Sequence, residues 1–222
     1  GLSNKGKTIR GLISPPQFSA KRGIYNTPFR VHLTTDEPDA VIRYTTDYSE
    51  PTITNGKVYN ESLEVRRTMV LRAAVYKQGM LPSRVETHTY VYNLGNSVTS
   101  LPMLSLVTER SNLWGRTGIM ETSPRNTTKR GIAWERPVSM ELIYPNTGET
   151  LHANAGLRVQ GGAYIRGRYN PNSGPPAGKY SFRLYFRGDY GLGRLRYPFF
   201  PDLQVEDFNH IVLRAGMNDH TN

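Results

Sequence analysis

Apolar and polar residues alternate with a period of two along several short stretches in the first half of the chain. This alternation is typical of strands that bury one face and expose the other. Turn-forming pairs such as Asn55-Gly56 and Gln78-Gly79 separate the stretches, and no segment of this region has a sustained helical period. The pattern predicts a small β-sandwich over residues 14–93, with strands at 29–34, 41–45, 69–76 and 85–92.

The second half of the chain has a similar β pattern with longer connections. A polar, glycine-containing stretch at 94–100 predicts a linker, and the apolar stretch that follows predicts a buried strand at 101–107. Ser111 and Gly115 are expected to cap and to end a short helical turn. Apolar residues that alternate with others within 138–143 predict a further strand.

The stretch at 155–186 predicts a strand, a glycine turn, a basic loop and a second strand. In the second strand one face is expected to carry Tyr180, Phe182, Leu184 and Phe186, and the other Ser181, Arg183, Tyr185 and Arg187. Eight basic residues and a single acid, Asp189, occupy positions 158–196; the basic residues are Arg158, Arg166, Arg168, Lys179, Arg183, Arg187, Arg194 and Arg196. Backbone N–H groups at glycines and fixed cations both favour an oxyanion, so the stretch predicts a phosphate-binding pocket.

Net charge, cysteine content and histidine spacing exclude some classes of function. The formal net charge of +10 is shared about equally by the two halves, and either a solvated surface or a polyanion partner fits this balance. Nucleic-acid binding is not expected, because aromatic and basic residues alternate between strand faces instead of forming one stacking platform. The absence of cysteine excludes disulfides and thiolate chemistry, and the five scattered histidines have no metal-ligand spacing. No apolar run reaches the roughly 18 residues of a membrane helix, so no membrane span is expected.

The stretch RYTTDYSEPT at 43–52 closely resembles the signature of the domain family named after the C-terminal module of chitobiase and β-hexosaminidase. The stretch LRAAVY at 71–76, followed by Gly79 and Pro82-Ser83, matches a second block of that family. The resemblance covers nearly all of residues 14–93. It implies an immunoglobulin-like accessory module that is not itself catalytic.

Within the signature, Asp47 is expected to bond backbone N–H groups of the turn that follows it. A structural turn is the main interpretation of this loop, and a ligand-binding loop is the alternative. Tyr48 stands where the family usually has glycine, which predicts a different φ at this point of the turn.

Residues 101–222 resemble the N-terminal part of the CotH kinase family, which is the spore-coat protein H type of atypical protein kinase. The similar blocks occur in the order that the family has; they are LPMLSL at 101–106, LWG at 113–115 with Gly118-Ile119, WERP at 134–137 with Glu141-Leu142, GLRVQGG at 156–162, KYSFRLYF at 179–186, Tyr190-Gly191, YPFFP at 197–201, and VLRAG at 212–216 with Asn218-Asp219.

This second resemblance implies binding of ATP with Mg or Mn, and phosphorylation of Ser or Thr on a protein substrate. It implies phosphate contacts for Lys179 and Arg166, while Gln160 and Gly178 depart from the family's pattern. Arg158 is a third candidate for a phosphate contact, with an ion pair to Glu135 or Glu141 as its alternative role. A solvated lysine is the alternative for Lys179. The family's catalytic and metal-binding acids would follow residue 222, so this segment by itself is expected to be inactive.

Together these observations predict a mainly β chain: an immunoglobulin-like sandwich followed by an incomplete α+β kinase-like lobe. The expected parts are an N-terminal extension at 1–13, the sandwich at 14–93, a linker at 94–100 and the lobe at 101–222. The pairing of modules suggests a piece of a large bacterial protein that is extracellular or at the cell surface. The alternative function is a non-catalytic structural or adhesive module, whose partners would be neighbouring surface or assembly proteins.

Overall fold

The computed structural model describes residues 11–95, 101–161, 180–200 and 202–215, and it is built mainly from strands, as predicted. The chain forms two compact units. The first comprises Gly1–Val107 together with Glu141–Leu151, and the second comprises Thr108–Met140 together with His152–Asn222. In the described part of the chain, no helix is both long and apolar enough to cross a bilayer.

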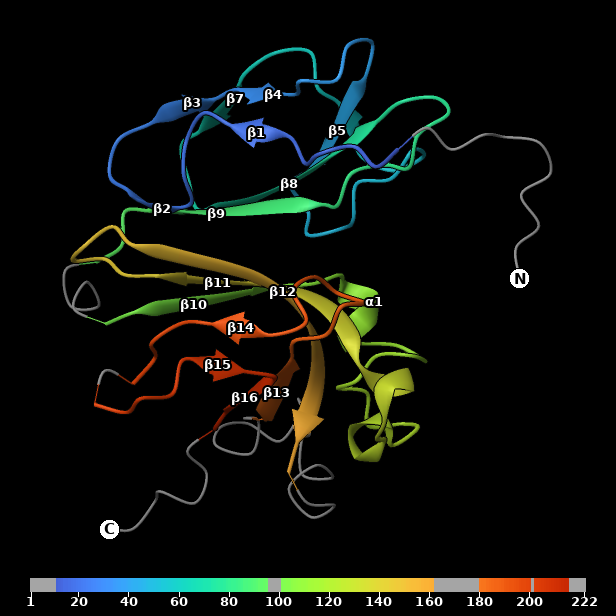
Figure 1. The fold of residues 1–222 in the computed structure, drawn as a ribbon, viewed down its shortest axis with the longest axis vertical. Coiled ribbons are helices and arrows are strands. Elements are labelled where there is room, and N and C mark those ends of the chain that lie inside the picture. The colour runs from blue at the N-terminus through green and yellow to red at the C-terminus, as the bar shows by residue number, and fades with distance from the viewer. Residues whose placement is uncertain (1–10, 96–100, 162–179, 201, 216–222) are drawn as a thin grey trace. The chain divides into compact units, whose positions relative to one another are not determined.

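The sandwich of the first unit has a main sheet of five strands and two strand pairs (Figure 1). The main sheet has the order β2-β9-β8-β5-β6, and the pairs are β1-β4 and β3-β7. The strands are β1 (Gln17–Phe18), β2 (Gly23–Tyr25), β3 (Phe29–Val31), β4 (Leu33–Thr34), β5 (Val41–Thr45), β6 (Lys57–Val58), β7 (Leu63–Val65), β8 (Met69–Tyr76) and β9 (Glu86–Tyr92).

The predicted strand at 29–34 is two strands with different partners. Phe29 pairs with Val65 in β7, whereas Leu33 pairs with Phe18 in β1. Between them, the backbone N–H of His32 donates to Ser19 Oγ at 2.8 Å, and His32 O accepts from the Ser19 N–H at 2.9 Å. The chain therefore changes partner at His32, which an alternation of side chains cannot reveal because it continues through the break.

The core of the sandwich lies between the main sheet and the strand pairs. Its buried members are Ile13, Val31, Leu33, Ile42, Val65, Leu71, Ala73, Val75 and Tyr90. In β8 the alternate residues Val70, Arg72 and Ala74 are buried as well. Both faces of β8 are therefore covered, although the sequence alternation by itself predicts one covered face.

A second five-stranded sheet has the order β10-β11-β12-β13-β16. Its strands are β10 (Met103–Val107), β11 (Arg136–Ile143), β12 (Thr150–Gln160), β13 (Ser181–Tyr185) and β16 (His210–Leu213). The predicted strand at 101–107 is present in shorter form, but the expectation of burial is wrong for Leu101 and Leu104, which are exposed. In β11 every residue from Val138 to Ile143 is buried, including Glu141.

The register of β12 and β13 separates a basic face from an apolar face. Arg158 lies opposite Arg183, and Gly156 lies opposite Tyr185. The intervening pair, Leu157 and Leu184, is buried on the other face. The predicted alternation is confirmed for β13, which is shorter than the expected strand at 180–187, because a hydrogen-bonded strand sends successive side chains to opposite sides.

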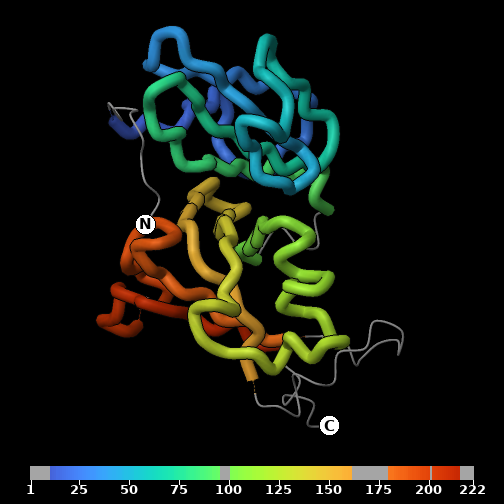
Figure 2. The backbone as a smooth tube through the Cα atoms, turned by 90° about the vertical axis from the view of Figure 1, so that its right-hand side faces the viewer, coloured from blue at the N-terminus to red at the C-terminus, as the bar shows by residue number. Residues whose placement is uncertain are grey.

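The remaining elements are short. They are α1 (Arg110–Leu113), η2 (Asn126–Thr128), η3 (Ile132–Trp134), β14 (Leu195–Arg196) and β15 (Asp207–Phe208). Figure 2 shows the path through residues 108–135, coloured green to yellow, as a run of turns and short helices. The predicted N-cap is wrong, because Ser111 lies inside α1, whose N-cap is Glu109. The predicted stop at Gly115 is confirmed: the helix ends at Leu113 with Trp114 as its C-cap, and Gly115 follows with φ 86°.

Candidate anion-binding site

A tyrosine surrounded by arginines lies at the centre of the basic face of β12 and β13. Tyr185 is 8% exposed. The guanidinium carbons of Arg158, Arg187 and Arg183 lie 4.8, 5.0 and 5.9 Å from the centre of its ring. Arg158 Nη2 also donates a hydrogen bond to the Tyr185 hydroxyl. Cations are attracted to the negative face of an aromatic ring, so one tyrosine helps to hold three positive charges near one another.

A buried carboxylate fixes one of these arginines. The side chain of Glu135 is 1% exposed and accepts hydrogen bonds from Arg187 Nε at 3.0 Å and Nη2 at 3.1 Å. The Tyr190 hydroxyl donates to the same carboxylate at 3.3 Å. The hydrogen bond to Glu135 raises the pKa of Arg187, and burial together with the charge of Glu135 raises the pKa of Tyr190 to about 12. Arg187 is thus held in a two-point, charge-assisted contact.

Gly156 provides the space in which these groups meet. A Cβ at this position would lie 2.4 Å from Tyr190 Cε2 and 3.0 Å from Glu135 Oε2. Because Gly156 pairs with Tyr185, the missing side chain lets the Tyr190 ring and the Glu135 carboxylate approach the strand beside Tyr185. We refer to Glu135, Gly156, Arg158, Arg183, Tyr185, Arg187 and Tyr190 as the Tyr185 cluster.

The cluster has more positive than negative charge. Glu135 compensates Arg187, but in the described part of the chain no carboxylate pairs with Arg158 or Arg183. Within the same described residues, the Nε atoms of both arginines are buried without a hydrogen-bond partner. Guanidinium groups bind carboxylates and phosphates through paired N–H donors, so this arrangement is suited to an oxyanion.

Only one of the three predicted phosphate-binding residues lies in the described part of the chain. Arg158 lies in the Tyr185 cluster, whereas Arg166 and Lys179 lie outside the residues that the structure describes. The alternative expectation, an ion pair of Arg158 with Glu135 or Glu141, is wrong. Glu135 pairs with Arg187, and Glu141 pairs with Arg22.

The sequence did not reveal the contacts among Glu135, Arg187 and Tyr190. Glu135 and Tyr190 are 55 positions apart, and no local pattern joins them. The signals that were available are the WERP block and the Tyr190-Gly191 pair, which belong to the CotH resemblance. The contact itself comes from the fold.

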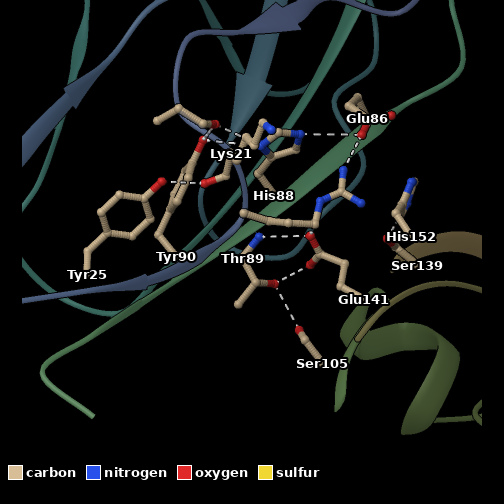
Figure 3. A network of polar contacts seen from close by, with 12 residues as sticks. Lys21, Tyr25, Glu86, His88, Thr89, Tyr90, Ser105, Ser139, Glu141 and His152 are labelled. Atoms are coloured by element: carbon tan, nitrogen blue, oxygen red, sulfur yellow. Dashed lines mark hydrogen bonds and ion pairs between the residues drawn. The ribbon is translucent and has the colours of Figure 1, made fainter. Parts of the chain in front are cut away.

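A second polar cluster lies in the first unit (Figure 3). The side chain of Glu141 is 0% exposed and pairs with Arg22 Nε at 3.1 Å. It accepts a hydrogen bond from the Thr89 N–H at 3.1 Å and another from the Thr89 hydroxyl. Arg22 also pairs with Glu86, which lies 3.4 Å from His88 Nε2. Glu141 of β11 therefore contacts Thr89 of β9 and Arg22, the residue before β2, and covers part of the face of β9 that is opposite the sandwich core.

Burial raises the pKa of Glu141, although the hydrogen bonds from Thr89 and the charge of Arg22 act in the opposite direction. Arg22 and the two Thr89 donors supply partners to both oxygens of this buried carboxyl group. Arg22, Thr89 and Glu141 use their polar groups to bind one another. We therefore interpret this cluster as a structural link and not as a ligand site.

In the signature turn of the sandwich, at 43–52, polar groups form hydrogen bonds with other residues of the same unit. Asp47 Oδ1 accepts hydrogen bonds from the Ser49 N–H at 3.2 Å and from the Ser49 hydroxyl at 2.6 Å, which confirms the predicted turn. Tyr48 O accepts from Arg72 Nη1 at 2.8 Å. Tyr48 has φ 69°, the left-handed region that favours glycine, so the tyrosine adopts a strained conformation instead of the altered φ expected from the sequence.

Comparison with known proteins supports one of the two resemblances. Residues 20–87 match the family model of the chitobiase/beta-hexosaminidase C-terminal domain. This match is confined to the sandwich and covers less than half of the chain, which is similar to that family in this part. A search of curated proteins finds no match. The CotH resemblance of residues 101–222 stays a prediction. In the described residues, no group of three His, Asp or Glu side chains could hold a metal ion.

Proposed function

We propose that the chain joins a non-catalytic accessory β-sandwich to the nucleotide-phosphate-binding lobe of a CotH-like atypical Ser/Thr protein kinase. The accessory role of the sandwich is supported by its match to the chitobiase/beta-hexosaminidase C-terminal domain and by the internally satisfied signature turn. The lobe is supported by the sequence blocks of residues 101–222 and by the charge of the Tyr185 cluster.

The observation that carries the proposal is the convergence of separate blocks. Glu135 comes from WERP, Gly156 and Arg158 come from GLRVQGG, and Tyr185 comes from KYSFRLYF. These residues meet Tyr190, of the Tyr190-Gly191 block, in one cluster on the face of β12 and β13. Blocks that are dispersed in the sequence but share one site are what a common binding function requires.

The chemistry assigned to the cluster is binding of phosphate oxygens. Kinases act chiefly by positioning the phosphoryl group and neutralising its charge. In this proposal Arg158 contacts the phosphates of ATP together with Arg166 and Lys179, which precede β13 in the sequence. The described residues contain no group of acids that could hold Mg²⁺ or Mn²⁺. The activity proposed for this chain is therefore nucleotide binding.

A thermal-shift measurement tests this function. With ATP and Mg²⁺ or Mn²⁺ at about 100 times Kd, binding stabilises the folded state by about 2.7 kcal/mol, which corresponds to roughly 5–10 °C in Tm for a chain of this size. Lys179→Ala should abolish the shift, and Lys57→Ala, an exposed lysine of the sandwich, should leave it unchanged. No shift in the parent chain, or an equal loss in both variants, would exclude the kinase lobe.

A non-catalytic structural or adhesive module is the second candidate. It is favoured by Gln160, where the CotH family usually has arginine, and by the way Glu135, Arg187 and Tyr190 satisfy one another. In that case ATP with Mg²⁺ or Mn²⁺ would leave Tm unchanged. Polyanion binding that falls steeply with salt and is indifferent to ATP would instead indicate a polyanion partner.

We place the protein at the bacterial surface or outside the cell, with a protein substrate or neighbouring surface proteins as partners. Protease treatment of intact cells tests this location. Digestion before lysis supports a surface position, and protection until lysis contradicts it.

A further inference from the structure

Two arginines of the Tyr185 cluster face each other directly across a strand pair. Arg158 in β12 and Arg183 in β13 are partners in the antiparallel register, so their side chains leave the same face of the sheet side by side. Like charges in this position repel each other. No acid in the described part of the chain pairs with either of them.

The tyrosine beneath them only partly offsets the repulsion. Both guanidinium groups lie within 5.9 Å of the Tyr185 ring centre, and Arg158 also donates to the Tyr185 hydroxyl. A ring quadrupole attracts each cation but does not cancel its charge. The buried Nε atom of each arginine, without a partner within the described ranges, is a further unfavourable feature. An anion between the two cations would offset this repulsion and accept hydrogen bonds from both guanidinium groups.

We propose that Arg158 and Arg183 act together as one oxyanion site, and that its ligand is a phosphate group of a polyphosphate chain. This inference rests on the proposed nucleotide function and adds Arg183 as a second binding residue. A tetrahedral phosphate has enough oxygens to accept hydrogen bonds from both planar guanidinium groups, whereas a carboxylate is satisfied by one of them.

Glu135 positions the pair without contacting the ligand. Its two oxygens hold Arg187, which lies 5.0 Å from the Tyr185 ring, and Tyr185 in turn accepts the hydrogen bond from Arg158. The charge of Glu135 is compensated by Arg187, so Glu135 orients the site while leaving the positive charge of Arg158 and Arg183 available.

Isothermal titration with inorganic tripolyphosphate tests the proposal on the 222-residue chain. Arg183→Gln should weaken binding at least tenfold. The matched control is Arg66→Gln, which removes the same charge from a side chain of the first unit that is 71% exposed. The control should change the affinity less than twofold. Equal losses in both variants, or no loss in Arg183→Gln, would overturn the site.

Stability provides an independent readout. Without anion, Arg183→Gln relieves the repulsion, so its Tm should equal or exceed that of the parent chain, and tripolyphosphate should raise Tm in the parent chain alone. A variant that is less stable without anion and still binds tripolyphosphate normally would make Arg183 merely structural. If Arg183→Gln fails to fold, Arg183→Lys keeps the charge and loses the planar fork, and it should bind at least threefold more weakly; unchanged affinity would overturn the proposal.

The outcomes separate this inference from the function on which it rests. Tripolyphosphate binding that needs Arg183, without an ATP shift that needs Lys179, supports the oxyanion site and removes the kinase lobe. An ATP shift that needs Lys179 and is unaffected by Arg183→Gln supports the lobe and overturns the oxyanion site.

Discussion

Gly156 is the position at which a single methyl group should disturb the Tyr185 cluster most directly. In Gly156→Ala the new Cβ would overlap the Tyr190 ring at 2.4 and 2.7 Å and would reach 3.0 Å from Glu135 Oε2. Either the ring must turn away or β12 must shift. A ring that turns away loses its hydrogen bond to Glu135, and a strand that shifts disturbs the pairing of Gly156 with Tyr185.

The magnitude follows from opposing contributions. Alanine in place of glycine in the middle of a strand stabilises by about 0.5–1 kcal/mol through chain entropy. Overpacking costs about 1–3 kcal/mol, and the lost hydrogen bond costs about 1 kcal/mol more. The free energy of unfolding of the second unit should therefore fall by about 1–3 kcal/mol in Gly156→Ala.

Urea unfolding followed by tryptophan fluorescence measures this change, because both tryptophans, Trp114 and Trp134, lie in the second unit. Gly193→Ala is the matched control, since a Cβ at Gly193 meets nothing within 4 Å. In a Tyr190→Ala background, where the ring is absent, Gly156→Ala should be nearly neutral. Stabilisation by Gly156→Ala, or an equal loss in both backgrounds, would refute the reasoning.

Three further predictions concern the strained turn and the two buried polar clusters. Tyr48→Gly should stabilise the first unit by up to about 1 kcal/mol, because φ 69° is costly for the exposed Tyr48 and costs glycine little. The larger chain entropy that glycine loses on folding offsets only part of this gain. Urea unfolding followed by circular dichroism measures the change, and a loss of stability would contradict the strain. The pKa of Glu141 is raised in the folded state. Its contribution to stability is therefore complete below the pKa of about 4.3 in the unfolded chain and is lost as pH rises through the higher pKa of the folded state. Glu141→Gln should flatten this part of the stability–pH curve, and an unchanged curve would contradict the prediction. The pKa of Tyr190 is about 12, above the ordinary 10.0, so its contribution is complete below pH 10 and is lost as pH rises through about 12; the ultraviolet titration of Tyr190→Phe should lack one phenol near 12, and loss of a phenol near 10 instead would contradict the burial.

Much of the fold was predictable because it depends on local patterns. Period-two alternation separated by Gly and Asn turns indicates strands with one buried face, and the sandwich strands at 41–45, 69–76 and 85–92 lie where the pattern predicts them. The two faces of β13 were also predictable, since the direction of each side chain in a strand follows from strand geometry alone.

The residues that pack against each face of a strand could not be predicted in the same way. The alternation places Thr89 on the face of β9 that is opposite the core, but only the fold brings Glu141 onto Thr89 from a strand 52 positions away. The partner of Arg158 was misassigned for the same reason. Glu135 and Glu141 were the obvious acids, and both are paired with other arginines.

The sequence by itself determined a basic, cysteine-free β chain, the strands of the sandwich, and the side of each strand on which the arginines lie. These properties depend on residue type and on neighbours a few positions away. Only the tertiary structure decided that Arg158 faces Arg183 across Tyr185, and that Glu135 reaches Tyr190 through the space left by Gly156. Such contacts depend on strand register and on packing between distant segments, which no local pattern encodes.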